Sequence, residues 1–202
     1  MPSPWIITAD GRRFDLLCPS LEQVSLRVIA AATAKMCRWT GHIQGFYSVA
    51  SHSVAVAQLC RDAVKPYALL HDAAEGYLGD VSTPLKNAMR MLSPAALAAY
   101  DQVTEPVERA IHLACGLQWP VPMDIHAEVK HADLVMLATE YRDLIPPGSP
   151  ALDMPVDMPP PRARPIIFEH DEYWGVAKDV FIDFARGLHR DGLLPKLPGL
   201  VA

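Results

Sequence analysis

The sequence predicts a mainly α-helical protein with a small β-hairpin at its N-terminus. Half of the 202 residues (50%) are hydrophobic, which suffices for a sizeable buried core. Apolar residues recur at helical spacing along much of the chain, whereas residues 5–17 place two β-prone runs around Asp10-Gly11, a strong hairpin signal. The length suits one domain, with the hairpin segment at 1–19 and a helical core at about 20–143.

Residues that begin and end helices set the order of the elements. Six helices are expected, at about residues 20–39, 48–62, 66–79, 94–116, 124–143 and 170–189. Ser20 and Ser48 suit the caps of the first two helices, and Pro66 suits the first turn of the third. Glu105-Pro106 is expected to restart the fourth helix. Residues 146–165 hold eight of the nineteen prolines, so we expect a loop there.

Charge, cysteine content and leader signals exclude several classes of protein. The formal net charge of -5 argues against binding to a nucleic-acid polymer, which needs clustered cations. The N-terminus lacks the features of a signal peptide, and no apolar stretch is long enough to cross a bilayer. The cysteines are widely spaced and indicate reduced thiols, at Cys18, Cys37, Cys60 and Cys115. We therefore expect a cytoplasmic protein without a membrane partner.

The segment at 69–86, LLHDAAEGYLGDVSTPLK, carries the most informative motif. His71 and Asp72 are adjacent, and Glu75 follows His71 by four residues, which places the two on one face of a helix. An acid within so apolar a helix needs a partner or a metal if it is buried. Imidazole beside carboxylate suits a divalent transition ion. His52 upstream and Asp133 on a later helix are available to complete such a site.

A histidine, a His-Asp pair and a distant aspartate on a later helix resemble the HD superfamily of metal-dependent phosphohydrolases. The surroundings are more specific, because Arg38-Trp39, Asp80 and Thr83-Pro84-Leu85-Lys86 accompany this pattern. This set is similar to the small 5′-deoxynucleotidase group and to the related deoxynucleoside triphosphatases. The resemblance spans about residues 20 to 143 and implies an HD-domain helical bundle. The Gly41-His42 element and the segment after Pro146 depart from the nucleotidase pattern.

The resemblance implies a role for each matching residue. The metal ligands would be His52, His71, Asp72 and Asp133, and they would hold Mn, Co, Fe, Ni or Zn. Glu75 would be the acid/base residue that positions the attacking water or protonates the leaving oxygen. Arg38 and Lys86 would grip the phosphate, and Trp39 and Asp80 would line the nucleoside pocket. His42 follows a flexible glycine, so it either reaches the substrate or is an ordinary loop histidine.

Each of these residues also has a purely structural alternative. His52 suits a core histidine, Asp133 a surface acid, and Trp39 a core aromatic. Asp80 suits a turn cap, and Arg38 suits an ordinary ion pair. Aromatic residues on the last helix suit packing on the protein's own core or on a second copy in a homodimer, and they are Tyr173, Trp174, Phe181 and Phe184.

The expected reaction is release of phosphate from a deoxynucleoside 5′-monophosphate. Hydrolysis of a deoxynucleoside triphosphate is the first alternative, and it would be favoured if Lys35, His42 or Arg90 converged beyond the α-phosphate. Cleavage of a signalling nucleotide is a second alternative. A third is a metal-binding regulatory module that uses the same fold without catalysis.

Overall fold

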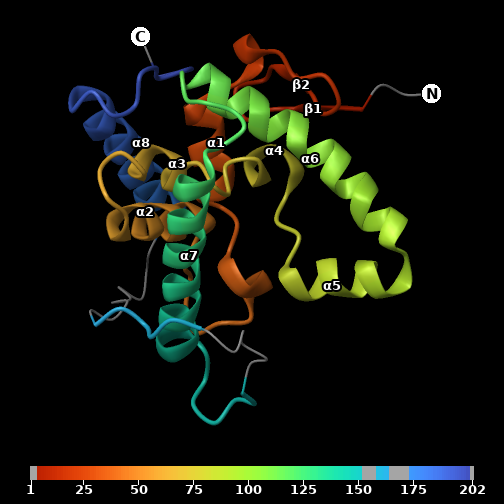
Figure 1. The fold of residues 1–202 in the computed structure, drawn as a ribbon, viewed down its shortest axis with the longest axis vertical. Helices are drawn as coiled ribbons and strands as arrows, with labels where there is room; N and C mark the ends of the chain where they lie inside the picture. Colours follow the sequence, from red (N-terminus) through yellow and green to blue (C-terminus); the bar gives the residue numbers. More distant parts are fainter. Residues whose placement is uncertain (1–3, 152–157, 164–172, 201–202) are drawn as a thin grey trace.

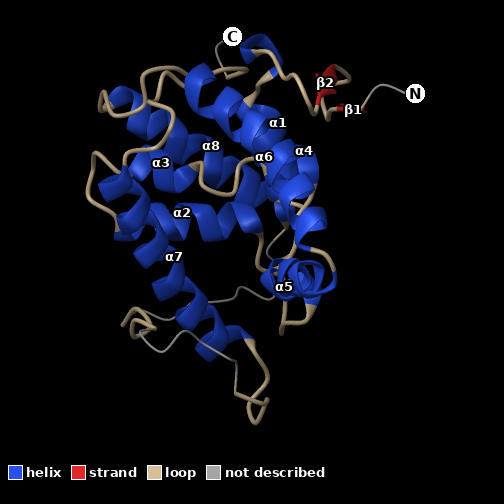
Figure 2. Ribbon diagram, turned by 45° about the vertical axis from the view of Figure 1, so that its right-hand side comes forward, coloured by secondary structure: helices blue, strands red, loops and turns tan. Residues whose placement is uncertain are grey.

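The computed structural model describes residues 4–151, 158–163 and 173–200, and it is mainly helical with one two-stranded antiparallel sheet in this part of the chain (Figures 1 and 2). The predicted fold class is therefore confirmed. The strands are β1 (Trp5–Ile7) and β2 (Arg13–Asp15). The helices are α1 (Leu26–Thr33), α2 (Val49–Leu59), α3 (Lys65–Leu69), α4 (Glu75–Leu78), α5 (Thr83–Leu92), α6 (Pro94–Ala114), α7 (Met123–Leu144) and α8 (Trp174–Arg190).

The predicted hairpin is present and is fixed to the helical body through one aromatic contact. Ile6 pairs with Phe14 across the two strands. Phe14 is fully buried and stacks on Tyr77 of α4, with ring centroids 3.7 Å apart. Gly11 in the turn has φ +76°, a conformation that glycine adopts without a steric penalty. The hairpin thus closes over α4, close to the chemically informative segment.

The continuous helix predicted over residues 20–39 is wrong. The chain instead forms a short 3₁₀ turn at Leu21–Gln23 and then α1, whose cap is Ser25 rather than Ser20. The Ser25 hydroxyl accepts a hydrogen bond from the backbone N–H of Val28. Beyond α1, Cys37 has an extended backbone and forms an isolated antiparallel bridge with Ser48, and a second 3₁₀ turn follows at Arg38–Gly41. Local hydrogen bonds therefore end the helix before the apolar periodicity does.

Helix α2 crosses the centre of the molecule and packs against α3, α7 and α8 (Figure 2). Its cap is the predicted Ser48, whose hydroxyl accepts from the backbone N–H of Ser51 at 3.1 Å. The residues of α2 itself are small or apolar on nearly all sides of the helix, which is typical of a buried element. This burial carries His52, which has 0% exposure, into the core.

The helix predicted over residues 66–79 is divided into α3 and α4, and His71-Asp72 lies in the turn between them. Backbone hydrogen bonds from Glu75 to Asp72 and from Gly76 to Ala73 span three residues instead of four. In such a turn, residues three apart share a face. Glu75 is therefore aligned with Asp72, whereas its predicted alignment with His71 assumed a continuous helix and stays a prediction.

A close approach between helices explains why Gly76 occupies this segment. A Cβ atom on Gly76 would lie 3.2 Å from the Cα of Ile29 in α1. The absence of a side chain lets α4 contact the backbone of α1, and this contact fixes the position of the turn that precedes α4.

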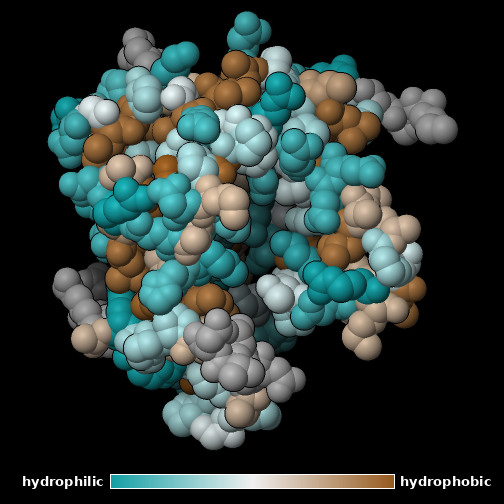
Figure 3. Space-filling model, viewed as in Figure 1, coloured by the Kyte–Doolittle hydropathy of each residue, from teal (hydrophilic) through white to brown (hydrophobic). Residues whose placement is uncertain are grey.

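Helices α5 and α6 pack together and form an arm beside the body of the molecule (Figure 1). The sequence analysis did not predict α5, whose polar and apolar residues leave it largely exposed. The predicted restart at Glu105-Pro106 is wrong, because α6 continues through Pro106. A hollow separates this arm from the body in the space-filling view (Figure 3).

Helix α7 begins at Met123, after Pro122 rather than at Asp124, and otherwise matches the prediction. The predicted last helix at 170–189 is observed as α8, although its first residues lie outside the described part. The expected loop at 146–165 lacks helix and strand wherever it is described, at 146–151 and 158–163.

A single cluster of buried apolar residues extends from Phe14 to Leu200. Phe181 is buried in it, and Trp174 and Phe184 pack against it, whereas Tyr173 is exposed. The four cysteines are free thiols. No helix in the described residues combines the length and apolarity needed to cross a membrane.

Candidate metal centre

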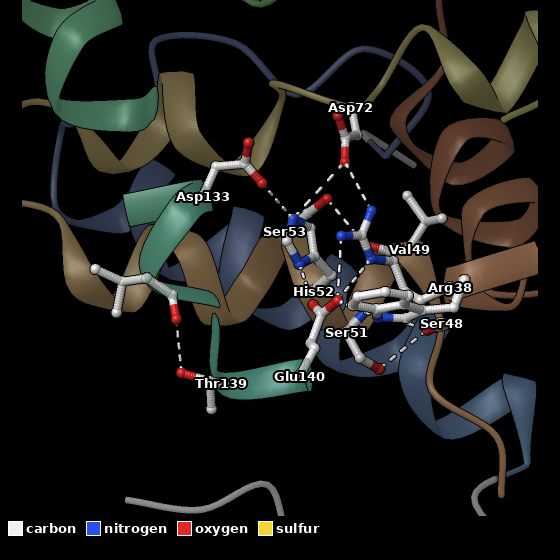
Figure 4. Close-up of polar contacts among 12 residues, drawn as sticks. Arg38, Ser48, Val49, Ser51, His52, Ser53, Asp72, Asp133, Thr139 and Glu140 are labelled. Atoms are coloured by element: carbon white, nitrogen blue, oxygen red, sulfur yellow. Dashed lines mark hydrogen bonds and ion pairs between the residues drawn. The ribbon is translucent and has the colours of Figure 1, made fainter. Parts of the chain in front are cut away.

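Three separate elements bring the predicted metal ligands together, and Figure 4 shows His52, Asp72 and Asp133 among them. His52 comes from α2, His71 and Asp72 come from the turn between α3 and α4, and Asp133 comes from α7. One candidate ligand atom from each of the first three lies within 4.8 Å of the others. His52 Nε2 lies 3.3 Å from Asp133 Oδ1 and 3.8 Å from Asp72 Oδ2. His71 Nε2 lies 3.2 Å from Asp72 Oδ2.

The hydrogen bonds of the two imidazoles test whether these residues fit a metal. His52 Nδ1 lies 2.5 Å from Glu140 Oε1, and His71 Nδ1 lies 2.7 Å from the carbonyl oxygen of Ala68. Each Nδ1 can therefore donate its proton to a protein oxygen, which leaves the lone pair on Nε2. Both Nε2 atoms are buried and make no hydrogen bond within the described residues. Two oriented, unpartnered imidazole nitrogens beside two carboxylates fit a divalent transition ion.

The charges of the cluster are balanced in favour of ionised carboxylates. Burial disfavours the charge on Asp72, but the neighbouring His71 outweighs this effect and holds the pKa of Asp72 well below its usual range. Burial is likewise outweighed at Asp133, whose contact with His52 lowers its pKa. Burial also disfavours a charged His71, yet Asp72 raises the pKa of His71 to about 9. A cation bound here would replace the proton that the carboxylate of Asp72 stabilises on the imidazole of His71.

Glu75 differs from these acids because it favours the protonated form. Its Oε2 atom is buried without a hydrogen-bond partner. Burial raises the pKa of Glu75 to about 8, and the negative charges of Asp72 and Asp80 act in the same direction. A carboxyl group that keeps its proton at neutral pH can act as a general acid.

Arg38, Trp39 and Glu140 form a hydrogen-bonded network beside the cluster. Arg38 donates to Glu140 Oε2 from Nε at 3.2 Å and from Nη2 at 3.1 Å, and the Trp39 indole donates to the same oxygen at 3.0 Å. Arg38 Nη1 also lies 3.9 Å from Asp72 Oδ2. The network therefore places two of the predicted substrate-binding residues next to the predicted ligands.

The sequence analysis missed Glu140, which is fully buried. Its position offered one signal, because Glu140 follows Asp133 by seven residues and so lies two helical turns further along the same face. Burial disfavours the charge on Glu140, but His52 and Arg38 outweigh this effect and keep its pKa low.

Trp39 and Thr40 have left-handed backbones, with φ of 58° and 54°. Such a conformation costs about 1–2 kcal/mol per residue without glycine. Strain of this kind persists where surrounding contacts hold the residue in place, as the Trp39 indole bond to Glu140 does. The indole also lies against Tyr141, with ring centroids 6.4 Å apart.

The remaining predicted site residues are less closely gathered. Lys86 lies on α5, where its Nζ is 5.4 Å from the ring centroid of Tyr100. Asp80 acts on the cluster through its charge on Glu75. The His42 side chain is exposed, and no hydrogen bond or ion pair joins it to the cluster among the described residues. These three residues surround the site more distantly than Arg38 and Trp39 do.

A second acid missed by the sequence analysis is Glu108, which lies on α6. Burial raises its pKa to about 7, the charge of Lys86 acts against this shift, and the charge of Asp72 acts with it. Glu108 thus lies within electrostatic reach of both the arm and the cluster. Its place within a long, otherwise ordinary helix gave no sequence signal for this.

No family model matches the chain. The chain is 36% identical over 140 residues to Uncharacterized protein YfdR of Escherichia coli, covering 69% of this chain and 72% of that protein. It is 34% identical over 153 residues to Uncharacterized protein RCAP_rcc00048 of Rhodobacter capsulatus, covering 71% of this chain and 74% of that protein. These identities, over these shares of each protein, are high enough to show that the three proteins are members of one family. The chain therefore belongs to the same family as these two bacterial proteins.

Proposed function

We propose that this protein is a metal-dependent phosphohydrolase of the HD superfamily that releases phosphate from deoxynucleoside 5′-monophosphates. The observation that carries the proposal is the convergence of the buried Nε2 atoms of His52 and His71, which make no hydrogen bond of good geometry, on the carboxylates of Asp72 and Asp133 at 3.2–3.3 Å. Two buried imidazole nitrogens and two carboxylates that converge without well-formed hydrogen bonds between them are the donor set that suits a divalent transition ion. The resemblance of the surrounding residues to deoxynucleotidases supports the choice of substrate.

Four residues would hold the ion, namely His52, His71, Asp72 and Asp133. A divalent ion at such a site lowers the pKa of water towards neutrality and polarises a phosphoryl oxygen. The protein supplies the orientation, because Glu140 and Ala68 fix the imidazoles from the opposite side.

Glu75 has the proton that hydrolysis of a phosphate ester requires. Attack by water on phosphorus breaks the bond to the 5′ oxygen, and this leaving oxygen must gain a proton to become the nucleoside hydroxyl. In the metal-free protein, burial raises the pKa of Glu75 to about 8, so the carboxyl group favours the protonated form that this role needs. Its alignment with Asp72 on one face of the turn directs it towards the cluster.

Arg38 provides positive charge for the phosphate. Its Nε and Nη2 atoms are used by Glu140, while Nη1 lies on the side of Asp72. A guanidinium held in this way has little rotational freedom left to lose when a phosphate binds. Trp39, fixed beside it, is the aromatic surface for the nucleoside.

The positions of other cations favour a monophosphate over a triphosphate. Lys35 Nζ lies 4.5 Å from the centroid of the Trp174 ring, and Arg90 donates to Asn87 on α5. His42 is exposed and does not contact the cluster in the described structure. The three cations that would bind further phosphates therefore do not converge, although a triphosphate remains the alternative to test.

The test is a substrate panel with the Mn²⁺-loaded protein. We expect free phosphate and nucleoside from deoxynucleoside 5′-monophosphates. Pyrophosphate or tripolyphosphate from deoxynucleoside triphosphates would instead establish the triphosphatase reaction. Products from cyclic or 3′-diphosphate nucleotides alone would favour a signalling substrate. Metal binding without turnover of any of these classes would favour the regulatory module and contradict the proposal.

A further inference from the structure

One buried carboxylate contacts a candidate metal ligand and two candidate substrate-binding residues at once, and Figure 4 shows Glu140 beside His52 and Arg38. Glu140 Oε1 lies 2.5 Å from His52 Nδ1, on the side opposite the metal-facing Nε2. Glu140 Oε2 accepts three hydrogen bonds, two from Arg38 and one from the Trp39 indole. The two oxygens therefore serve two different parts of the site.

We infer that Glu140 is a positioning residue that couples metal binding by His52 to the placement of Arg38 and Trp39. The inference rests on the proposed function, which identifies His52 as a metal ligand and Arg38 and Trp39 as substrate-binding residues. Oε1 holds the His52 proton on Nδ1, which keeps the Nε2 lone pair available for the ion. Oε2 holds the guanidinium and the indole at the edge of the same cluster.

The chemistry of the contacts requires a carboxylate at this position. The groups that surround Glu140 are all donors: the Nδ1–H of His52, the guanidinium of Arg38 and the indole N–H of Trp39. Only an acceptor at both oxygens satisfies donors on both sides. A purely structural anchor for Arg38 would need one of these oxygens and would leave the other free for any partner.

Glu140→Gln tests this requirement directly, because a glutamine side chain has one oxygen and one NH₂ group. If its oxygen faces Arg38 and Trp39, the NH₂ group meets Nδ1–H of His52 and drives that proton to Nε2, where it blocks the metal. If its oxygen faces His52, the NH₂ group meets the guanidinium and indole donors. Either orientation therefore disrupts one side of the site while the shape of the side chain is retained.

The first measurement is Mn²⁺ affinity and, in parallel, the KM for a deoxynucleoside 5′-monophosphate. Loss of a residue that orients a metal ligand costs about 10–100-fold in metal affinity or activity. We expect Glu140→Gln to show a loss of this size in one of the two quantities. The matched control is Glu128→Gln, since Glu128 lies on the same helix and pairs with the exposed Arg61. The control should retain both quantities.

The second measurement does not depend on turnover. In the ¹H–¹⁵N spectrum of protein loaded with diamagnetic Zn²⁺, we expect a strongly downfield His52 Nδ1 proton and a downfield Trp39 indole proton. His52→Gln and Trp39→Phe assign the two signals. Glu140→Gln should abolish or shift one of them upfield, whereas Glu128→Gln should change neither.

Two outcomes overturn the inference while leaving the proposed function intact. One is a folded Glu140→Gln variant with wild-type metal affinity, KM and both proton signals. The other is a Zn²⁺-loaded wild-type protein without the hydrogen-bonded His52 Nδ1 proton, a result that needs no variant to fold. The wild-type protein could also bind metal and show both downfield proton signals but hydrolyse no nucleotide. This result overturns the proposed function and supports the role of Glu140. A wild-type protein that binds no divalent ion overturns both.

Discussion

Asp133 and Glu140, seven residues apart on α7, contact opposite nitrogens of the same imidazole. Asp133 Oδ1 lies 3.3 Å from His52 Nε2, and Glu140 Oε1 lies 2.5 Å from His52 Nδ1. Seven residues complete almost two helical turns, so both acids face α2. A single helix thus supplies a candidate metal ligand and the acceptor that orients a second one. The packing of α7 on α2 therefore places both acids around His52 in the candidate metal centre.

Asp72→Ala should remove bound metal and activity together. Asp72 contributes a buried, ionised oxygen that lies within 4 Å of both candidate histidine nitrogens. Its loss deletes a charged ligand and leaves two imidazoles that would repel a cation when protonated. Elemental analysis after dialysis measures the metal content. Asp62→Ala is the control, since Asp62 pairs with Lys65 and its side chain is mostly exposed. A variant of Asp72 with full metal content would contradict the ligand role.

Glu75→Gln should retain the metal while turnover falls about 100-fold, the usual scale for the loss of a general acid or base. Glutamine keeps the size of the side chain but has no proton to give to the leaving oxygen. Metal content and kcat are measured on the same preparation. Glu105→Gln, an exposed change on α6, should leave both unchanged. Near-normal turnover in the Glu75 variant would show that this residue has a structural role.

The sequence predicted the identity of the site better than its local structure. The resemblance to the HD superfamily named His52, His71, Asp72 and Asp133 as a set, and the structure brings these side chains together, while their role as ligands stays a prediction. The turn at residues 70–74 was not found, because apolar periodicity alone does not distinguish a continuous helix from two short ones. The contact of Gly76 with Ile29 is a tertiary one, and the sequence carries no sign of its partner.

The role of Glu140 could not be predicted from the sequence for the same reason, because it depends on tertiary contacts. A glutamate near the end of a long helix is usually solvent-exposed. Its burial depends on donors from residues about a hundred positions away, Arg38 and Trp39, and this proximity arises only when α7 packs beside the loop after α1. Periodicity could have suggested that Glu140 shares a face with Asp133, but it could not have named the three groups that it binds.

Tyr77→Phe should destabilise the protein without altering the metal centre. The Tyr77 hydroxyl accepts the buried backbone N–H of Ser25 at 3.0 Å, while its ring stacks on Phe14. Phenylalanine keeps the stack but leaves the N–H without a partner, which costs about 1–3 kcal/mol. Urea unfolding measures the change, and metal content should stay at the wild-type level. An unchanged free energy of unfolding would mean that water or another group replaces the hydroxyl.

His112 should make a contribution to the stability of the metal-free protein that is lost as the pH falls below the ordinary histidine pKa. His112 is buried between the rings of Tyr67 and Trp119, and burial lowers its pKa from the ordinary value of 6.5, although a hydrogen bond to the Glu108 carbonyl opposes the shift. Below pH 6.5 the unfolded chain therefore binds a proton that the folded chain resists, so acidification favours unfolding until the folded pKa is passed.

His112→Gln removes this titration while its amide can still donate to the Glu108 carbonyl. The variant should be less stable at pH 7.5, because it loses the ring packing. The difference between its free energy of unfolding and that of the wild type should nevertheless shrink between pH 7.5 and 5, because every other titrating group is common to the two proteins. Urea unfolding of chelator-treated protein across this range measures both curves. Parallel curves would show that His112 takes up a proton as readily in the folded protein as in the unfolded chain.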